Sequence, residues 1–252
     1  MYYILPRLLY NPIQFINNFG GEGNASKSPY LSASDAFEIY NSNANYDPPV
    51  PGEHYYDFRY GDVVFFVMDT RRYRSRTDDD ITTHTMLGDT QLTALHTWLS
   101  RVNETSTFKF IVSSVPFTSL WTHDAQLDSW AGFPAEKAGL LEAFHSVPNI
   151  MILSGDRHEF AAVEFSSASP VHHTVREFST SPLSMFYVPF VRTLRMQSDA
   201  SITRKQSNTI AINGTTEVVT TVEDVPQERV LKYLPIGNYK WHVSTSFARA
   251  CY

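Results

Sequence analysis

The sequence contains a single cysteine and no long apolar run. Because Cys251 has no second cysteine to pair with, the chain cannot be a small scaffold held together by intrachain disulfides. The longest strongly apolar run, Val63–Met68, is far shorter than the roughly 20 residues that a membrane-spanning helix requires. We therefore expect no membrane span, and we do not interpret Met1–Phe15, which Pro6 and Pro12 interrupt, as a signal peptide.

Basic residues are also in deficit. The 20 Lys and Arg residues are outnumbered by 26 Asp and Glu residues, which gives a formal net charge of −6 at pH 7. Proteins that bind the phosphate backbone of nucleic acids usually carry an excess of positive charge, so we expect no nucleic-acid partner. A chain of 252 residues that is 42% hydrophobic and 14% aromatic can nevertheless bury a large core, which excludes global disorder.

The short motifs of several enzyme and binding classes are missing as well. The sequence contains no G-x-G-x-x-G, no phosphate-binding P-loop, no G-x-S-x-G nucleophile elbow and no Cys-x-x-Cys. These absences argue against dinucleotide-binding and P-loop folds, against α/β-hydrolases and against zinc fingers.

Apolar strands alternate with amphipathic helices through the middle of the chain. This order is typical of a layered α/β fold. We expect one domain over residues 1–252, with an irregular part at 1–54, an α/β core at 55–190 and a loose part at 191–252. The patterns predict helices over Thr90–Val102 and Pro134–Phe144, and strands over Tyr55–Arg59, Val63–Met68, Phe108–Val115, Asn149–Leu153, Ala161–Phe165 and Thr174–Phe178.

Four further local features are predicted. A short helix is expected over Ala33–Tyr40, and Asp89 is expected to cap the start of the helix that follows it. A hairpin through Asn213-Gly214 and a last strand around Tyr239–Val243 are expected in the C-terminal part.

Polar residues follow three of the predicted strands, and ligands of open α/β sheets bind beyond such strand ends. The loops concerned are 69–74, 114–118 and 154–159. In the last of them, Asp156 and His158 place a carboxylate and an imidazole two residues apart, and these are donors that suit a metal ion. From spacing alone, the alternative that Asp156 caps a turn and that His158 is a solvated surface histidine stays open.

The first of these loops is rich in arginine. Asp69 is followed by Arg71, Arg72, Arg74 and Arg76, whose guanidinium groups could bind a phosphate through paired hydrogen bonds. The alternative is that Asp69 pairs with one of these arginines and fixes the loop, because charged clusters in loops are usually paired or solvated.

Five longer blocks carry a family resemblance. They occur at Tyr55–Asp62, Val67–Ser75, Leu87–Leu92, Ser129–Glu136 and Ser154–Glu159. In content, order and approximate spacing they resemble the PhoD-like alkaline phosphatase family of metallophosphatases. The resemblance implies an α/β/β/α sandwich, a metal centre with calcium and iron, and hydrolysis of phosphate monoesters or diesters.

The resemblance also implies roles for individual residues. Asp156 and His158 correspond to the C-terminal metal-ligand motif of the family, and His158 and Arg71 are the candidate catalytic groups. Arg71, Trp130 and Asn18 are the candidate contacts to the phosphate ester. The chemistry implied is metal-assisted attack on phosphorus, with cationic side chains stabilising the charge that develops.

One part of the family pattern has no counterpart in this sequence. The family places its first metal ligands N-terminal to the position of Asn17, but Met1–Gln14 contains no carboxylate and no histidine. We therefore expect an N-terminally truncated sandwich with an incomplete metal site. Two functions follow as alternatives: a metal-dependent phosphatase or phosphodiesterase, or a catalytically inactive relative or gene-model fragment that acts at most as a binding module.

Overall fold

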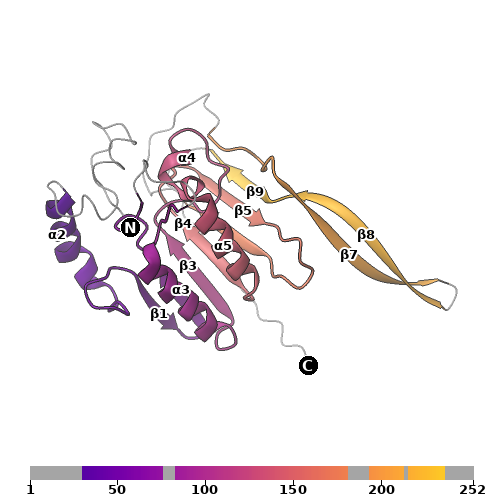
Figure 1. Ribbon diagram of the computed structural model, residues 1–252, viewed down its shortest axis with the longest axis horizontal. Helices are drawn as coiled ribbons and strands as arrows, with labels where there is room; N and C mark the ends of the chain where they lie inside the picture. The colour runs from indigo at the N-terminus through magenta and orange to yellow at the C-terminus, as the bar shows by residue number, and fades with distance from the viewer. Residues whose placement is uncertain (1–29, 76–82, 181–192, 213–214, 236–252) are drawn as a thin grey trace.

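In the computed structural model, the described residues are 30–75, 83–180, 193–212 and 215–235. Their largest unit is a seven-stranded mixed sheet with the strand order β1-β2-β3-β4-β6-β5-β9 (Figure 1). Strands β2, β3, β4 and β6 are parallel to one another, whereas β1 and β5 run antiparallel to their neighbours. The strands are β1 Tyr56–Tyr60, β2 Val63–Val67, β3 Phe108–Ser113, β4 Ile150–Ser154, β5 Phe160–Phe165, β6 Val175–Ser179 and β9 Glu228–Leu234.

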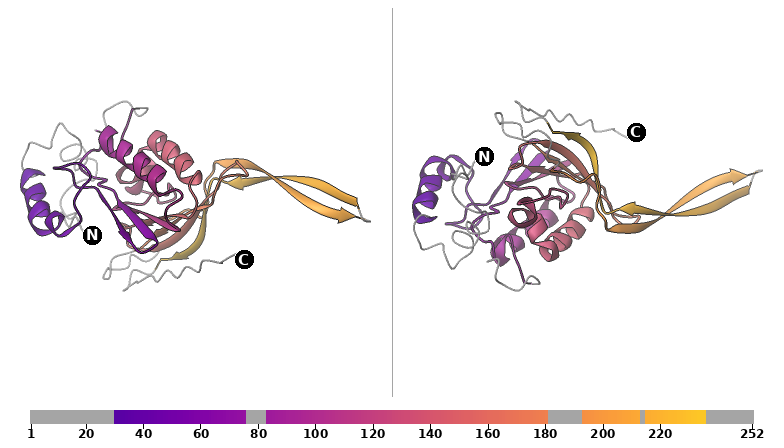
Figure 2. Two further views of the ribbon diagram at one scale, coloured as in Figure 1. Left: turned by 90° about the horizontal axis from the view of Figure 1, so that it is seen from below. Right: turned by 90° about the horizontal axis from the view of Figure 1, so that it is seen from above.

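Two helices cover one face of this sheet. Helix α3 (Gly88–Val102) connects β2 to β3, and helix α5 (Pro134–His145) precedes β4. Figure 2 shows both helices on the same side of the sheet. The short elements α4 (Ala125–Asp128) and η3 (Trp130–Gly132) lie between β3 and α5, while α2 (Tyr30–Tyr40) and η2 (Ser42–Ala44) precede β1.

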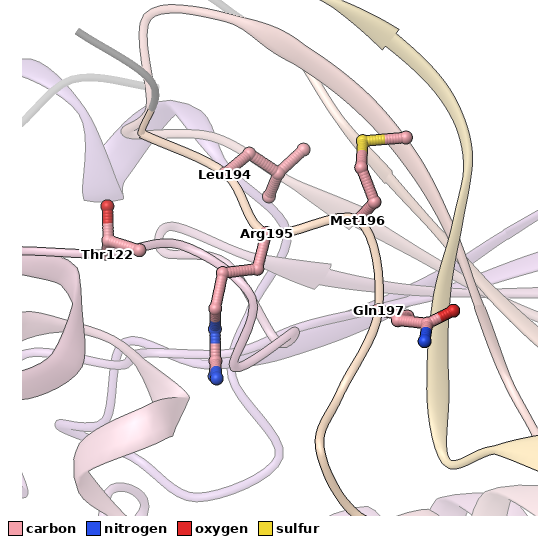
Figure 3. A pocket seen from close by; sticks show the side chains of 5 residues that line it. All are labelled: Thr122, Leu194, Arg195, Met196 and Gln197. Carbon is pink, nitrogen blue, oxygen red and sulfur yellow. The ribbon is translucent and has the colours of Figure 1, made fainter.

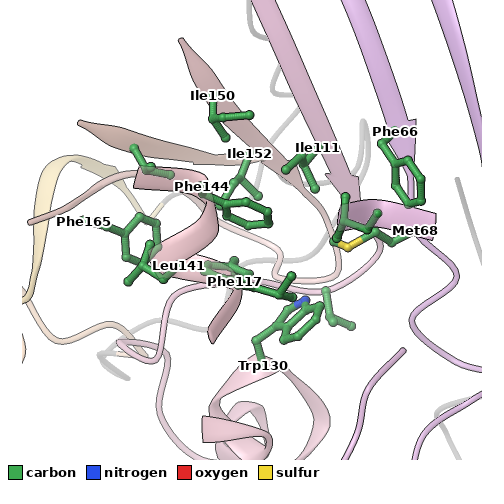
Figure 4. Close-up of a cluster of buried hydrophobic side chains, with 14 of the residues drawn as sticks. Phe66, Met68, Ile111, Phe117, Trp130, Leu141, Phe144, Ile150, Ile152 and Phe165 are labelled. Carbon is green, nitrogen blue, oxygen red and sulfur yellow. The ribbon is translucent and has the colours of Figure 1, made fainter. Parts of the chain in front are cut away.

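The hydrophobic core lies between the sheet and these two helices. Side chains alternate across a strand, so every second residue of a central strand points toward the helices. Figure 4 shows Ile152 from β4 close to Phe144 from α5. Phe66 from β2 instead packs against Trp98 of α3, with ring centroids 5.6 Å apart, and all four side chains are buried. Burial of each such side chain contributes about 1.5–3 kcal/mol, which explains why the apolar runs predict the strands well.

The opposite face of the sheet carries a row of stacked aromatic rings. The ring centroids of Phe58 and Phe65 lie 4.6 Å apart, and those of Phe65 and Phe110 lie 5.2 Å apart. These rings are only half-buried, unlike the residues beneath the helices. The predicted α/β class is confirmed, and one helical layer on one large sheet is consistent with the expected α/β/β/α sandwich.

The start of α3 differs from the sequence-based expectation. The helix begins at Gly88, with Leu87 at the N-cap position and Asp89 inside the first turn, so Asp89 is not the cap. The carboxylate of Glu136 on α5 instead accepts hydrogen bonds from the N–H groups of Met86 (3.1 Å) and Leu87 (3.2 Å). A carboxylate from a neighbouring helix thus holds the two residues that precede α3, whereas the N–H of Gly88, the first helical residue, donates to the hydroxyl of Thr85 (2.7 Å).

These two hydrogen bonds give a stability prediction. Glu136→Gln places an amide donor opposite a backbone N–H, so we expect the free energy of unfolding to fall by about 1–2 kcal/mol. Glu142→Gln is the matched control, because Glu142 is on the same helix and its side chain is 70% exposed. Urea denaturation of both variants measures the difference, and an equal effect of the two substitutions would contradict this role of Glu136.

The C-terminal part is more regular than the sequence suggests. Strands β7 (Ser201–Ile212) and β8 (Thr215–Pro226) form a long two-stranded ribbon that projects from the body of the molecule (Figure 1). The expected turn at Asn213-Gly214 and the expected strand at Tyr239–Val243 lie outside the described residues. Strand β9, which the sequence did not predict, joins the large sheet beside β5.

None of the helices within the described ranges has both the length and the apolar character needed to cross a membrane.

Candidate functional site

The carboxyl ends of β2, β3 and β4 bring the three polar loops together. The hydroxyl groups of Thr70, after β2, and Ser114, after β3, are 2.5 Å apart. A Cβ atom on Gly155, after β4, would lie 3.5 Å from the carbonyl oxygen of Ser114. Because these strands are parallel and adjacent, their following loops meet at one edge of the sheet, as the sequence predicts.

Asp69 shapes the first loop through the backbone. Its Oδ1 accepts hydrogen bonds from the N–H groups of Arg71 (2.9 Å) and Arg72 (3.0 Å). The side-chain amide of Gln91 on α3 is bonded to both the N–H and the carbonyl of Asp69, each at 2.8 Å. Asp69 therefore fixes the loop, but by a turn of the backbone rather than by pairing with an arginine side chain.

Two arginines of this loop converge on Asp128, the last residue of α4. The Nη1 of Arg74 lies 2.6 Å from Asp128 Oδ1, and the side chain of Arg74 is only 2% exposed. Arg71 makes a bidentate contact with the same carboxylate, through Nη1 to Oδ1 and through Nη2 to Oδ2. The Nη2 of Arg71 also lies 3.9 Å from Asp156 Oδ1, so its guanidinium group is situated between two carboxylates.

Burial and charge have opposing effects on this cluster. Burial by itself would raise the pKa of Asp128, but the positive charges of Arg71 and Arg74 outweigh it and hold that pKa well below its ordinary value. Burial, together with the like charge of Arg71, lowers the pKa of Arg74 to about 10. All three groups are therefore charged at neutral pH.

The loop after β4 carries Asp156 in an uncommon backbone conformation. Its φ of 72° is in the left-handed region that non-glycine residues rarely adopt. The next residue anchors the loop: the Nη1 of Arg157 lies 3.1 and 3.2 Å from the two carboxylate oxygens of Asp124. The guanidinium group of Arg157 also lies over the ring of Trp121, 5.5 Å from its centroid.

The next two residues of this loop lie at the same sheet edge. His158 is half-buried, two residues after Asp156. Glu159 Oε2 accepts a hydrogen bond from the hydroxyl of Tyr233 on β9 at 3.0 Å, and a second one from the hydroxyl of Thr193. Contacts on both sides thus hold the Asp156–His158 segment in place.

The other two predicted site residues have different positions. We expected Trp130 in a loop facing the substrate, but its side chain is 0% exposed and packs against Phe117 in the core (Figure 4). The indole N–H of Trp130 donates a hydrogen bond to Ser113 at 3.2 Å. A large aromatic ring gains more from burial than from solvent exposure, which explains this placement. Asn18 lies outside the described residues.

Sequence reasoning missed Asp128. It is separated from Arg71 by 57 positions along the chain, and nothing in the residues around it shows that it meets an arginine. The one feature of the sequence that could have pointed to Asp128 is its position just before the Ser129–Glu136 block, which carries part of the family resemblance.

A pocket of about 430 Å³ lies apart from this cluster (Figure 3). The pocket is lined by Thr122 and by residues 194–197, and none of the predicted site residues lines it. Its one charged lining residue, Arg195, pairs with Asp199 at 2.8 Å. The pocket is therefore not the candidate site.

The donor set for a metal ion is small. Asp156 and His158 are the two predicted ligands in the described part of the chain. Across residues 30–75, 83–180, 193–212 and 215–235, no group of three or more His, Cys, Asp and Glu side chains could hold a metal ion.

Comparison with models of protein families matches residues 20–225 to the PhoD-like phosphatase family. The chain belongs to the PhoD-like phosphatase family. The resemblance carried by the five sequence blocks is thereby confirmed, and PhoD-like phosphatases are generally metal-dependent.

A solved structure entitled "Structure of PhoD" is also similar to this PhoD-like chain. The two are 20% identical with a TM-score of 0.48, and the match covers 65% of this chain and 37% of that chain. The chain thus spans well under half the length of that PhoD protein. Comparison with curated proteins finds no match.

Proposed function

We propose that this PhoD-like protein hydrolyses phosphate esters at the carboxyl ends of β2, β3 and β4, with Arg71 binding the phosphoryl group. The observation that carries the proposal is the geometry of Arg71. Its side chain is 19% exposed at a sheet edge where ligands usually bind, and it is held by the buried Asp128. A guanidinium group with a fixed plane is suited to two oxygens of a phosphoryl group.

The surrounding charges define how a phosphate would bind. The contact of Arg71 with Asp128 is short and bidentate. The contact of Arg71 with Asp156 is 3.9 Å long and correspondingly weak. An incoming phosphoryl oxygen therefore competes with Asp156 and not with Asp128. In the reaction, Arg71 orients the phosphoryl group and offsets the negative charge that grows on its oxygens.

Asp156 and His158 are the residues that we propose as metal ligands. A carboxylate and an imidazole together suit a transition-metal or calcium centre of the kind that the sequence resemblance implies. A bound metal ion supplies Lewis acidity and a nucleophile at neutral pH. We propose these two side chains as a part of the ligand set only.

Turnover and metal content test this function together. We expect the purified chain to release p-nitrophenolate from p-nitrophenyl phosphate or its bis ester, and we expect a chelator to abolish that release. Mass spectrometry should find less bound metal in Asp156→Asn and His158→Ala, but not in the control His96→Ala, a histidine exposed on α3. Binding of inorganic phosphate with no turnover under any metal would instead support the binding-module alternative.

A further inference from the structure

A fully buried carboxylate lies on the strand next to β4, which leads to the candidate site. Glu177 on β6 is 0% exposed. Its Oε1 accepts hydrogen bonds from the N–H of Phe117 (2.7 Å) and the hydroxyl of Ser154 (2.5 Å), and its Oε2 accepts one from the N–H of Thr118 (2.7 Å). One side chain therefore joins the loop after β3 to the last residue of β4.

A second buried carboxylate holds the same loop. Glu228 on β9 accepts hydrogen bonds from the hydroxyl of Thr118 (2.5 Å) and the N–H of Ser119 (2.8 Å). Its other oxygen lies 2.5 Å from the ammonium group of Lys137 on α5. The charged groups that act on Glu177 in this buried network are Lys137 and, through it, Glu228.

The loop and strand end that Glu177 joins lead to the candidate site. The loop after β3 continues to Asp124, which pairs with Arg157, and to Asp128, which pairs with Arg71. Ser154 directly precedes Gly155 and Asp156. Movement of either element would therefore shift a carboxylate that contacts Arg71.

We propose that Glu177 is a positioning residue of this site, whose carboxylate fixes the loop at Phe117-Thr118 and the end of β4, and thereby places Asp128 and Asp156 against Arg71. Its expected effect on catalysis rests on the proposed function. The anchoring of the loop does not, so the two can be tested separately.

The anchoring depends on the ionised form of Glu177. All three neighbours donate hydrogen bonds, so a proton on this carboxyl group has to face a donor, and one contact is lost. Burial raises the pKa of Glu177 to about 7, although the hydrogen bonds from Ser154, Phe117 and Thr118 and the charge of Lys137 oppose the shift. At pH 8 Glu177 is therefore mostly ionised and can accept all three hydrogen bonds.

Protonation of Glu177 does not by itself destabilise the fold. A carboxyl group with a raised pKa in the folded protein lowers the free energy of unfolding as pH rises from its unfolded pKa toward its folded pKa. Acidification from about pH 8 to about pH 6 therefore does not weaken the fold as a whole through Glu177. The same sign applies to a local opening that exposes Glu177 to water, so the anchoring is tested by substitution at one pH, at which Glu177 is ionised.

Hydrogen–deuterium exchange tests the anchoring directly. At pH 8, where Glu177 is ionised, we expect protection factors of peptides over Val115–Trp121 and Leu153–His158 to be about tenfold lower in Glu177→Gln than in the wild-type chain, the loss of one hydrogen bond to a charged group. Glu164→Gln is the matched control, because Glu164 on the adjacent β5 binds Arg176 on the outer side of the sheet. Wild-type protection in Glu177→Gln at pH 8 would overturn the proposal.

Two further measurements keep the proposal testable. The first applies if Glu177→Gln does not fold, and the second separates the anchoring role from the proposed phosphatase function. Ser154→Ala removes one donor to Glu177 and should lower the protection at pH 8 by a smaller factor, whereas no change would count against the proposal. If the enzyme turns over p-nitrophenyl phosphate, the acid limb of its pH profile should disappear in Glu177→Gln. Exchange that follows the prediction in a chain without turnover would refute the phosphatase function and leave the anchoring role supported.

Discussion

Arg71→Met is expected to lower kcat/KM for p-nitrophenyl phosphate by about 10²- to 10³-fold, the loss typical of one preorganised donor to a developing oxyanion. The physical reason is that Arg71 is held in one orientation by Asp128 and is the partly exposed member of the buried charge cluster. Arg74, the other arginine on Asp128, is almost fully buried and is too deep to replace it. Steady-state kinetics and the affinity for inorganic phosphate measure the effect.

Arg72→Met provides the control. Arg72 is the next residue in the same loop, but its side chain donates a hydrogen bond to the carbonyl of Gly52 (2.9 Å) and lies over the ring of Tyr73. We expect less than about threefold loss of kcat/KM from this change, because this guanidinium group binds a backbone carbonyl and not the carboxylates around Arg71. Equal losses in the two variants would show that overall charge, and not the placement of Arg71, determines phosphate binding.

Asp128→Asn is expected to lower the free energy of unfolding by about 3–5 kcal/mol, the range found when one partner of a buried ion pair is removed. Asp128 neutralises two guanidinium groups, and the side chain of Arg74 is only 2% exposed. Without the carboxylate, the charge of Arg74 stays buried with no opposite charge bonded to its Nη1. Chemical denaturation followed by circular dichroism measures the loss.

The pH dependence of this loss follows from the lowered pKa of Asp128. A group with a lowered folded pKa stabilises the protein above its unfolded pKa, and this contribution is lost as pH falls toward the folded value. The difference between wild type and Asp128→Asn should therefore be constant between about pH 6 and 8 and should decrease below about pH 4.

Asp124→Asn is the matched comparison for Asp128→Asn. Asp124 also binds an arginine, Arg157, but its side chain is 32% exposed. We expect a loss of about 1 kcal/mol or less, because solvent screens a partly exposed pair. If Asp128→Asn were no more destabilising than Asp124→Asn, the cluster around Asp128 would not be the rigid support that we assign to it.

The parts of the fold that the sequence predicts are those governed by apolar periodicity. The runs Val63–Met68 and Phe108–Val115 become β2 and β3, each within two residues of the predicted bounds. The parts of the fold that the sequence did not predict are determined by charge and hydrogen bonding between distant residues. Strand β9 begins with Glu228, a residue that suggests solvent exposure in a sequence, yet it is buried because Lys137 comes from α5 to meet it.

The candidate site shows the same division. The strand ends nominate three loops that the structure brings together at one edge of the sheet, where Arg71 and Asp156 lie 3.9 Å apart. The partner that orients Arg71 could not be predicted, since Asp128 arrives from a distant part of the chain and many other carboxylates were equally available. Glu177 was equally hidden, because only the fold shows that its neighbours all donate hydrogen bonds.

A crystal of this chain soaked in tungstate, a heavy analogue of phosphate, tests most directly whether Arg71 forms a phosphate site. Anomalous density should appear within hydrogen-bond distance of the Arg71 guanidinium group, beside Asp156 and His158. Density only elsewhere, such as next to Arg195 in the pocket of Figure 3, would contradict the assignment of the site.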